Sequence, residues 1–493
     1  MDTSPPFPGI LRAMKIPFFS RKPSHHLAIS INNPDARSLL FDRKGRIAGS
    51  ASKVIPSSSG PQGWIEQNPA DILAAVRDTL RAADVTAKPA VAAALMIEAD
   101  AILCWDKQTG EALSPAFSST AAETPKDQRD IADGIRRRTG RMPTGRCGAI
   151  RMQWCVENLD AVKEAADRGT LVTSPLVSWL LFHLIEGEPR IICDSANARE
   201  TLLFDPKSRD WNTDMVGLFD LERSYLPTCV PTMVNFGVLK DNGVPLYLVT
   251  SKRSASMLAG NAVPDTTTAF IELDDEATLL TALPEDGAVP EHFLDMIVLD
   301  DNKDVVGGTE GKIHGAGAAL AWQLAKTGQA DDIDKIGEWM TQVSNAPVFL
   351  NGIGELASPW WRHDFPTEFV GDGDSREQTV AVAESLLFML KENLDSMALV
   401  SGYINQIVVR GELARIDGFC QRLADLTGSP VWRYPDDTNI ARGAAWLVAD
   451  QPEQWQADEP TVFTPTKDSE LTDRFWRWQA QMFQRLKQYA DID

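Results

Sequence analysis

The chain contains 493 residues, of which 43% are hydrophobic and 24% are charged, and its formal net charge at pH 7 is -21. It is too long for one hydrophobic core and suits two domains of roughly 200 to 250 residues each. The negative charge argues against sequence-independent binding to nucleic acid or anionic lipid, whose surfaces need a basic counterpart. No stretch approaches the ~18 uninterrupted apolar residues of a membrane span. We therefore expect small molecules or proteins as partners.

Cysteine and histidine usage points to a protein without disulfides or a bound metal. The six cysteines are scattered without a Cys-x-x-Cys pair, which is typical of reduced thiols in a large cytoplasmic protein. The six histidines show no spacing of three or four residues that would place two of them on one helix face as ligands. We expect a cytoplasmic location and no metal site.

The first half of the chain begins with residues 1–24, which lack the uninterrupted apolar core of a signal peptide and are interpreted as a flexible N-terminal extension. Three strands are then predicted over residues 27–31, over 38–41 and from Arg46 onward, with a turn at 42–45. A helix over 69–83 follows, because its apolar residues recur at helical spacing, and then a strand over 91–97. The pattern is βββαβ.

The second half repeats a comparable α/β pattern. Strands are predicted at 267–273, 295–299, 406–410 and 431–433, and helices at 315–327, at 377–397 and through Phe419 and Leu423. The tail at 470–489 places Phe475, Trp478, Met482, Leu486 and Tyr489 at spacings of three and four residues, which indicates a packing stripe on a closing helix. Two similar halves predict two α/β domains that meet near residue 250.

A series of short motifs follows in a characteristic order. The motifs are Gly63-Trp64-Ile65-Glu66-Gln67-Asn68-Pro69, Trp105-Asp106-Lys107-Gln108-Thr109-Gly110, Asp194-Ser195-Ala196-Asn197-Ala198-Arg199, Leu202-Leu203-Phe204, Asp210-Trp211, Glu310-Gly311, Gly317, Trp322, Ala383-Glu384-Ser385 and Gly443-Ala444-Ala445. In this order they resemble the FGGY family of carbohydrate kinases, closest in pattern to its glycerol kinases, over about residues 27–489.

The resemblance implies a two-domain fold of the actin-like and hexokinase-like (ribonuclease H-like) ATPase class, with a central cleft. Residues 25–250 would form the N-terminal, substrate-side domain and residues 251–455 the C-terminal, nucleotide-side domain. Residues 456–493 would form a tail with the closing helix. FGGY relatives commonly associate, so a homo-oligomer, a dimer or a tetramer, is also implied.

The resemblance also locates the positions at which phosphoryl transfer would need a metal-binding carboxylate and a base. The family's Asp-x-Gly-Thr-Thr phosphate turn corresponds to Ser30-Ile31-Asn32-Asn33-Pro34, so Ser30 stands at the metal-carboxylate position. Asn32 and Asn33 are weak candidates for nucleotide contacts. The base position corresponds to Lys252. No catalytic residue of the family is therefore intact.

The nucleotide-binding motifs are also altered. The second phosphate turn, normally rich in glycine, corresponds to a stretch in which Thr267 and Thr268 remain but no glycine does. The family's Asp-Gly-Gly motif corresponds to Arg410-Gly411-Glu412, which keeps one glycine. The carboxylate of Glu412 would repel nucleotide phosphates. These residues are weak candidates for cofactor contacts.

The family's polyol contacts fall on residues of different chemistry, and Asp100 alone could do a similar task. The scaffold motifs match while the site positions do not, a distribution expected when folding is retained and catalysis is not. The substrate-pocket positions that follow from the resemblance are Ala99, Asp100, Ser119, Arg146, Lys252 and Arg253.

Three functions fit these observations. The first is a kinase-fold protein, or pseudokinase, that no longer transfers phosphate and has a binding or regulatory role, because a fold alone does not carry a function. The second is an active ATP-dependent sugar or polyol kinase with a rearranged site, in which Lys252 replaces the base. The third is a scaffold or assembly subunit. ATP and Mg²⁺ are expected as cofactors only for the second.

The ligand is expected to be a small molecule, and two arrangements of the pocket stay open. The basic side chains at these positions could converge on an anion, with Arg forks supplying the geometry. They could instead pair with nearby acids and form a salt-bridged plug. The basic residues are Arg146, Lys252, Arg253 and Arg410, with Arg151 one helical turn from Arg146 if that segment is helical. The acids are Glu98, Asp100 and Glu412.

Overall fold

The computed structural model describes residues 25–83, 88–98, 100–119, 131–285, 287–435, 438–455 and 458–490, with side chains up to Gln488. The predicted extension at 1–24 and the pocket position Ala99 lie outside these ranges. The chain forms two compact units, each built from three segments. Unit 1 comprises Met1–Val263, Met296–Gly307 and Thr438–Ala457, and unit 2 comprises Pro264–Asp295, Gly308–Asp437 and Asp458–Asp493.

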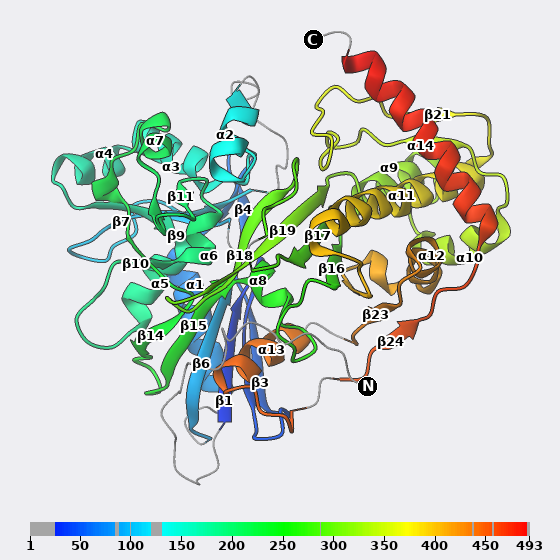
Figure 1. Ribbon diagram of the computed structural model, residues 1–493. Coiled ribbons are helices and arrows are strands. Elements are labelled where there is room, and N and C mark those ends of the chain that lie inside the picture. The colour runs from blue at the N-terminus through cyan, green and yellow to red at the C-terminus, as the bar shows by residue number, and fades with distance from the viewer. Residues whose placement is uncertain are drawn as a thin grey trace. The chain divides into compact units, whose positions relative to one another are not determined.

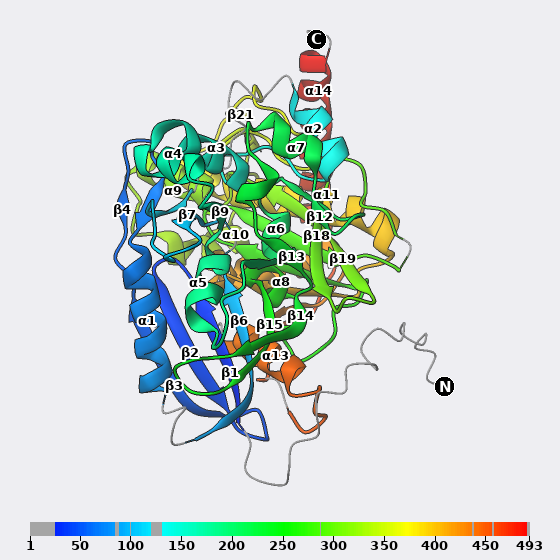
Figure 2. The same ribbon diagram turned by 90° about the vertical axis from the view of Figure 1, so that its left-hand side faces the viewer.

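The main sheet of unit 1 has six strands in the order β14-β15-β6-β1-β2-β3. Strands β1, β2 and β3 form an antiparallel meander, and β1 and β15 both run parallel to β6. These strands lie side by side in Figures 1 and 2, and they confirm the predicted βββαβ pattern. Their bounds are β1 His25–Ile31, β2 Asp35–Phe41, β3 Ile47–Val54, β6 Ala90–Ile97, β14 Met233–Val238 and β15 Pro245–Ser251.

Helix α1 (Pro69–Ala82) begins where the sequence provides a cap and a proline. The side chain of Asn68 accepts the N–H of Ala70 at 2.9 Å, and Pro69 occupies a first-turn position at which its missing N–H removes no helical bond. The face bearing Ile72, Leu73, Val76 and Leu80 is buried, and α1 packs on β2 and β3. The helical spacing in the sequence therefore predicted this face correctly.

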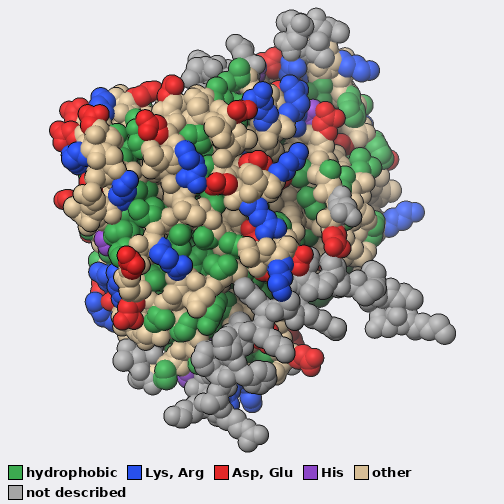
Figure 3. Space-filling view, turned by 60° about the vertical axis from the view of Figure 1, so that its left-hand side comes forward, with side chains coloured by type: hydrophobic (Ala, Val, Ile, Leu, Met, Phe, Trp, Pro, Cys, Tyr) green, Lys and Arg blue, Asp and Glu red, His purple; other side chains and the backbone are tan. Residues whose placement is uncertain are grey.

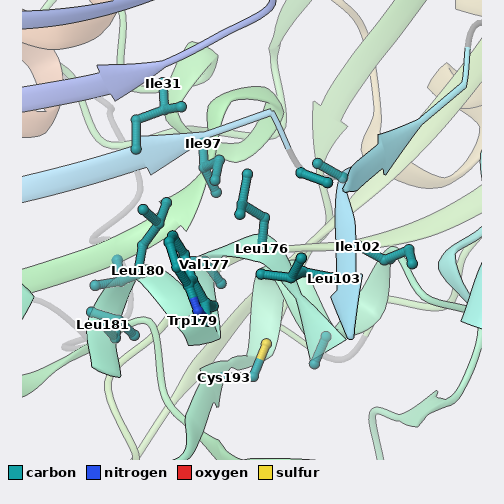
Figure 4. Packing of buried hydrophobic residues seen from close by; sticks show 14 of the residues in the cluster. Ile31, Ile97, Ile102, Leu103, Leu176, Val177, Trp179, Leu180, Leu181 and Cys193 are labelled. Atoms are coloured by element: carbon teal, nitrogen blue, oxygen red, sulfur yellow. The ribbon is translucent and has the colours of Figure 1, made fainter. Parts of the chain in front are cut away.

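The core of unit 1 lies between the main sheet and the elements that follow it. Ile31 and Ile97, from the carboxyl ends of β1 and β6, extend toward the apolar residues of α5, including Leu180 (Figure 4). The strands and helices of this part are β4 Ser58–Ser59, β5 Ile65–Gln67, β7 Ile102–Asp106, β8 Ala116–Ser118, α2 Ala132–Thr139, α3 Gly148–Asn158, α4 Asp160–Asp167, β9 Leu171–Pro175, α5 Leu176–Leu184, β10 Ile192–Asp194, α6 Ser195–Arg199, β11 Phe204–Asp205, β12 Asp210–Trp211, α7 Thr213–Leu218, a 3-10 turn Arg223–Tyr225, β13 Thr228–Val230 and α8 Lys252–Ser256.

Helix α13 (Thr438–Val448) comes late in the sequence but belongs to unit 1, where it packs on β1 and β6. Gly443, in the Gly-Ala-Ala motif, allows α13 to approach the segment after α8 closely, because an added Cβ would collide with the carbonyl oxygen of Leu258. Strand β18 (Leu294–Asp300) begins in unit 2 and continues into unit 1. The units are therefore not two consecutive halves of the chain.

Unit 2 is built on a sheet in which β19, β17, β16, β22, β23 and β24 are successive neighbours. Strand β16 pairs parallel with β22 and antiparallel with β17. The bounds are β16 Thr268–Leu273, β17 Ala277–Ala282, β19 Val305–Ile313, α9 Gly317–Thr327, a 3-10 turn Ile333–Lys335, α10 Ile336–Gln342, β20 Val348–Leu350, β21 Glu368–Val370, α11 Ser375–Ser401, β22 Gln406–Arg410, a 3-10 turn Leu413–Arg415, α12 Asp417–Thr427, β23 Val431–Arg433, β24 Thr461–Phe463 and α14 Ser469–Ala490.

Long helix α11 is the centre of the core of unit 2. Asp374 accepts the N–H groups of Arg376 and Glu377, and Glu377 accepts the N–H of Asp374, which together form a capping box. The predicted apolar stripe of α11 is buried, and so are Phe475, Trp478 and Met482 of α14. Both predicted helices are thereby confirmed, although Tyr489 lies beyond the described side chains.

The compact units change over after Val263, whereas the sequence placed the family's domain boundary at 250, inside β15. The family domains over 25–250 and 251–455 stay a prediction. On the face shown in Figure 3, acidic and basic side chains are interspersed, with small groups of hydrophobic side chains between them. Among the described residues, no helix combines the length and apolarity that a membrane crossing needs.

Candidate functional site

The carboxyl ends of β1, β6 and β15 bring several predicted site positions together in unit 1. Ile31 and Ser251 are both in register with Ile97, so these three strands end side by side. The N–H of Glu98 donates to the carbonyl oxygen of Ile31 at 2.9 Å and extends this edge. Ligands of open α/β sheets commonly bind at the carboxyl ends of parallel strands. Ser30 and Lys252 therefore lie at the edge where a site is expected.

The turn after β1, at the position of the family's phosphate turn, is closed by its own hydrogen bonds. The N–H of Asn32 donates to the carbonyl oxygen of Asp35 at 2.8 Å, and its amide group donates to the Asp35 carboxylate at 3.3 Å. Ser30 Oγ donates to Asn32 Oδ1 at 3.2 Å. Pro34 has no N–H, and Asn33 is exposed in the turn. Few donors remain here for a phosphate group.

The same turn does not fit a magnesium ion. Its nearest carboxylate, Asp35, already accepts Arg37 Nε at 2.6 Å. Ser30 offers a neutral hydroxyl where hard cations such as Mg²⁺ prefer carboxylate oxygen. Within the described ranges, no cluster of three or more His, Cys, Asp or Glu side chains is placed to hold a metal ion. The residues present therefore do not match a Mg²⁺-nucleotide site.

Lys252 is the first residue of α8. The Ser251 hydroxyl accepts the N–H of Ser254 at 2.9 Å and fixes this start. Lys252 Nζ lies 4.0 Å from a carboxylate oxygen of Glu98, and the Lys252 side chain is 23% exposed. A lysine that acts as a base must be uncharged, a state that burial away from carboxylates favours. Lys252 is largely buried, but it has the Glu98 carboxylate close by.

Arg253 belongs to a second group of charges in unit 1. Arg253 Nη1 donates to Glu200 Oε2 at 2.7 Å, and Arg141 Nη2 donates to the same oxygen at 2.6 Å. Arg141 and Glu200 are only 8% and 11% exposed at their side chains. Because this carboxylate and both guanidinium groups are largely removed from water, each depends on the others for compensation.

Asp100, Ser119 and Arg146 are held near one another by hydrogen bonds between side chains and backbone groups. The Ser119 N–H donates to the Asp100 carboxylate at 3.0 Å. The guanidinium of Arg151 donates to the carbonyl oxygens of Gly145 at 2.5 Å, of Arg146 at 3.0 Å, and of Asp100. Three of the predicted pocket positions are thus brought together.

The segment that joins Arg146 to Arg151 is not helical throughout, so the condition for aligning these two side chains is not met. Helix α3 begins at Gly148, so Arg146 precedes the helix instead of standing one turn from Arg151. The Arg151 side chain is fully buried, and burial lowers the pKa of its guanidinium group. Arg151 therefore joins backbone segments and presents no charge to a ligand.

In unit 2 the predicted nucleotide contacts fall at opposite ends of one strand pair. Thr268 at the start of β16 is in register with Gln406, and Glu272 near its end is in register with Arg410. Thr268 and Glu272 are four positions apart along β16, a distance of about 13 Å. The sheet does not bring Thr267 and Thr268 next to Arg410.

Each end of this strand pair is occupied by local contacts. The N–H and hydroxyl of Thr267 both donate to Asp265 Oδ1, at 2.9 and 3.1 Å, which uses the donors that the family-like turn would offer. At the other end, Arg410 Nη2 donates to Glu272 Oε2 at 2.7 Å. The cation at the family's Asp position is therefore paired inside its own sheet.

The retained Gly411 has a structural reason. Its φ is +100°, and an added Cβ would lie 2.5 Å from the carbonyl oxygen of Leu273 and 2.7 Å from Asp274 Oδ1. Asp274 Oδ1 also accepts the N–H of Glu412 at 2.9 Å. Glu412 lies 3.5 Å from Arg415 in an exposed ion pair. The close approach of the two turns requires glycine whether or not nucleotide binds.

Some of these partners could have been found in the sequence and others could not. Asp265 precedes Thr267 by two residues, the spacing of an Asx turn, so its contact is a local signal. Glu200 and Arg141 carry no such signal, because each meets its partners from a distant part of the chain. Sequence reasoning therefore found the positions of the cations but missed the acid that neutralises Arg253.

The fold agrees with the comparison to known proteins. Residues 27–247 match the model of the N-terminal domain of the FGGY family of carbohydrate kinases, and residues 265–449 match that of its C-terminal domain. The chain belongs to the FGGY family of carbohydrate kinases.

Individual relatives cover almost the whole chain at low identity. The glycerol kinase of Delftia acidovorans is 24% identical over 506 residues, covering 92% of this chain and 97% of its own. That of Enterococcus casseliflavus is 25% identical over 490 residues, covering 91% and 94%. The solved structure of Plasmodium falciparum glycerol kinase with ADP aligns with a TM-score of 0.83 at 21% identity, covering 94% and 98%. The two-domain α/β fold is thereby established.

Proposed function

We propose that this FGGY chain does not transfer phosphate and acts through binding, in a regulatory role. The observation that carries the proposal is Lys252, which stands at the base position and lies 4.0 Å from the carboxylate of Glu98. A lysine beside a carboxylate does not supply the carboxylate that would accept a proton from an attacking hydroxyl. The reaction requires that acceptor at this place.

The turn after β1 supports the same proposal independently. Phosphoryl transfer depends on backbone donors and a metal ion that neutralise the developing charge. Ser30 offers no carboxylate for Mg²⁺, and Asp35 is already paired with Arg37. Two separate requirements of the reaction are therefore unmet at one sheet edge.

The paired cations favour the salt-bridged plug over an open anion pocket. Arg253 is held by Glu200 and Arg410 by Glu272, each at 2.7 Å. A small anion would bind at these residues only by displacing a carboxylate. We propose accordingly that the ligand is a small molecule recognised without free arginine forks, and that the protein is a cytoplasmic homo-oligomer.

An active, ATP-dependent polyol kinase is the second candidate. One observation favours it: the relatives that align over more than nine-tenths of this chain carry the name glycerol kinase. This function would require Lys252 to leave Glu98 and lose its proton when substrate binds.

A thermal-shift experiment separates the two candidates. A ligand that binds only the native state raises the melting temperature by mass action. We expect no Mg²⁺-dependent rise in Tm with ATP or ADP, because the turn after β1 lacks a metal carboxylate. A rise of several degrees with ATP that requires Mg²⁺ would refute the proposal and support the kinase. The same measurement with phosphate, citrate and sugar phosphates tests whether the paired cations can bind a small anion. The salt-bridged plug predicts no rise in Tm with any of them.

A further inference from the structure

Helix α14 has an exposed apolar face as well as its buried one. Leu471, Phe475, Trp478 and Met482 face the core of unit 2. On the outer side, the side chains of Trp476 and Phe483 are 57% and 49% exposed. Large aromatic side chains in adjacent turns of one exposed helix face are unusual for a surface without a partner. In Figure 1 this helix lies along the outside of unit 2.

The exposed residues follow the spacing of a helix-pairing seam. Asp473, Trp476, Ala480, Phe483 and Lys487 are all exposed, and they are separated by three, four, three and four residues. This is the a/d spacing by which two helices pack along a shared stripe. The buried stripe of α14 is a different set of residues, so the helix can pack on its own unit and on a second helix at once.

The order of the residues fits an antiparallel pair of identical helices. Asp473 and Lys487 each lie seven residues from Ala480, about 10 Å along the helix axis on either side. A twofold axis at Ala480 would place each Asp473 opposite the Lys487 of the other copy. It would place Trp476 of each copy beside Phe483 of the other. The small side chain of Ala480 would allow the two helices to approach closely at the centre. An interface of this kind is self-complementary, as a twofold dimer requires.

The charges on this face are available for such pairing. Among the described residues, neither Asp473 nor Lys487 forms an ion pair with another side chain. Beside the seam, Arg477 and Gln484 are both exposed, and the same axis brings Arg477 of one copy near Gln484 of the other. Like charges therefore do not meet across the axis.

We propose that α14 is a dimerisation surface, and that its partner is α14 of a second copy of this chain in antiparallel orientation. The inference does not depend on whether the protein transfers phosphate. It assigns the oligomeric contact to Asp473, Trp476, Ala480, Phe483 and Lys487. The apolar centre supplies most of the affinity, and the charged ends fix the orientation.

Charge reversal with rescue tests the proposal on the full chain. Sedimentation velocity over a range of concentrations should show a dimer. Asp473→Lys and Lys487→Asp should each raise its dissociation constant at least about fivefold, since like charges then face each other twice per dimer. The double variant Asp473→Lys with Lys487→Asp should return within about twofold of the wild type. A monomer at every concentration, or a double variant no better than the single ones, would overturn the proposal.

Two further variants locate the axis. Trp476→Ala should weaken the dimer at least about tenfold, whereas Leu399→Ala, a change at an 86% exposed leucine on α11, should leave it unchanged. Ala480→Cys should form a disulfide-linked dimer under mild oxidation, because residue 480 meets itself at the axis. Thr472→Cys lies on the same helix about 12 Å from the axis and should not. Equal cross-linking by both cysteine variants would contradict the assigned axis.

Discussion

At the residue scale, Asp194 shows how a family-like motif can serve the fold instead of catalysis. It caps α6: its carboxylate accepts the N–H of Asn197 at 3.0 Å and the side-chain amide of Asn197 at 2.7 Å. Complete burial nevertheless raises the pKa of Asp194 to about 7, because desolvation outweighs these hydrogen bonds. The native state therefore holds a proton on Asp194 at a pH at which the unfolded chain has lost it.

This pKa predicts a pH dependence of stability. Between the unfolded pKa of 3.8 and the folded value of about 7, the native state binds the extra proton, so the contribution of Asp194 to stability is largest at low pH and falls as pH rises. Asp194→Asn should remove a change of roughly 2 to 3 kcal/mol between pH 5 and pH 7.5. Urea unfolding of the wild type and the variant at pH 5 and pH 7.5 measures this difference.

The comparison must be made between the two proteins at each pH. Burial lowers the pKa of His26 to about 4, so its contribution rises with pH between about 4 and 6.5, opposite to that of Asp194. His26 is present in both proteins and cancels from the difference. Equal pH slopes for the wild type and Asp194→Asn would show that Asp194 does not hold its proton.

The residues of the site were predictable in position more than in environment. The proposed replacement of family carboxylates by Ser30 and Lys252 rests on the sequence motifs alone. The carboxylate that approaches Lys252 was also within reach, because Glu98 follows a predicted strand. The partner of Arg253 was not, since Glu200 lies 53 residues away in the sequence and meets Arg253 only when the chain folds.

At the element scale, α14 is attached to α11 by charge as well as by packing. Arg474 donates to both oxygens of Glu384, at 2.8 to 3.1 Å, and the two side chains are 5% and 3% exposed. Arg422 lies 3.5 Å from the same carboxylate. Burial raises the pKa of Glu384, although the arginines oppose this shift. Glu384, in the Ala383-Glu384-Ser385 motif of α11, thus anchors α14.

Removing one member of this group should be costly. Arg474→Ala should destabilise unit 2 by about 3 kcal/mol, the usual effect of leaving one partner of a buried ion pair without compensation. Arg415→Ala is a control in the same unit, since the Arg415 side chain is 76% exposed and its loss should change stability by less than about 0.5 kcal/mol. The midpoint of urea unfolding, followed by tryptophan fluorescence, gives both values. Equal midpoints for the two variants would show that packing alone holds α14.

The helices that the sequence predicted are those with a clear period. Helices α1, α11 and α14 were found because one face of each repeats at helical spacing. Strand β17 was missed, and all six of its residues are buried. A strand covered on both faces has no alternation of polar and apolar residues, so its sequence lacks the signal that marks a half-buried strand.

At the scale of the whole molecule, the sequence predicted two α/β bodies but not how the chain divides between them. Residues 296–307 and α13 belong to unit 1, although both follow the predicted boundary. No local sequence pattern shows that a segment belongs to the other unit, because its place depends on which sheet offers a free face. Gly443 is the residue that permits the packing of α13, and its reason appears only when Leu258 lies against it.

The central proposal is that this FGGY chain does not transfer phosphate, because unsuitable groups fill the positions proposed for the base and the metal ligand. The most direct test measures phosphorylated product from Mg²⁺-ATP with glycerol and common sugars, for the wild type and for Lys252→Ala. The account predicts no product above the uncatalysed background in either protein. Wild-type turnover that disappears in Lys252→Ala would show that Lys252 acts as a base, and would contradict the account.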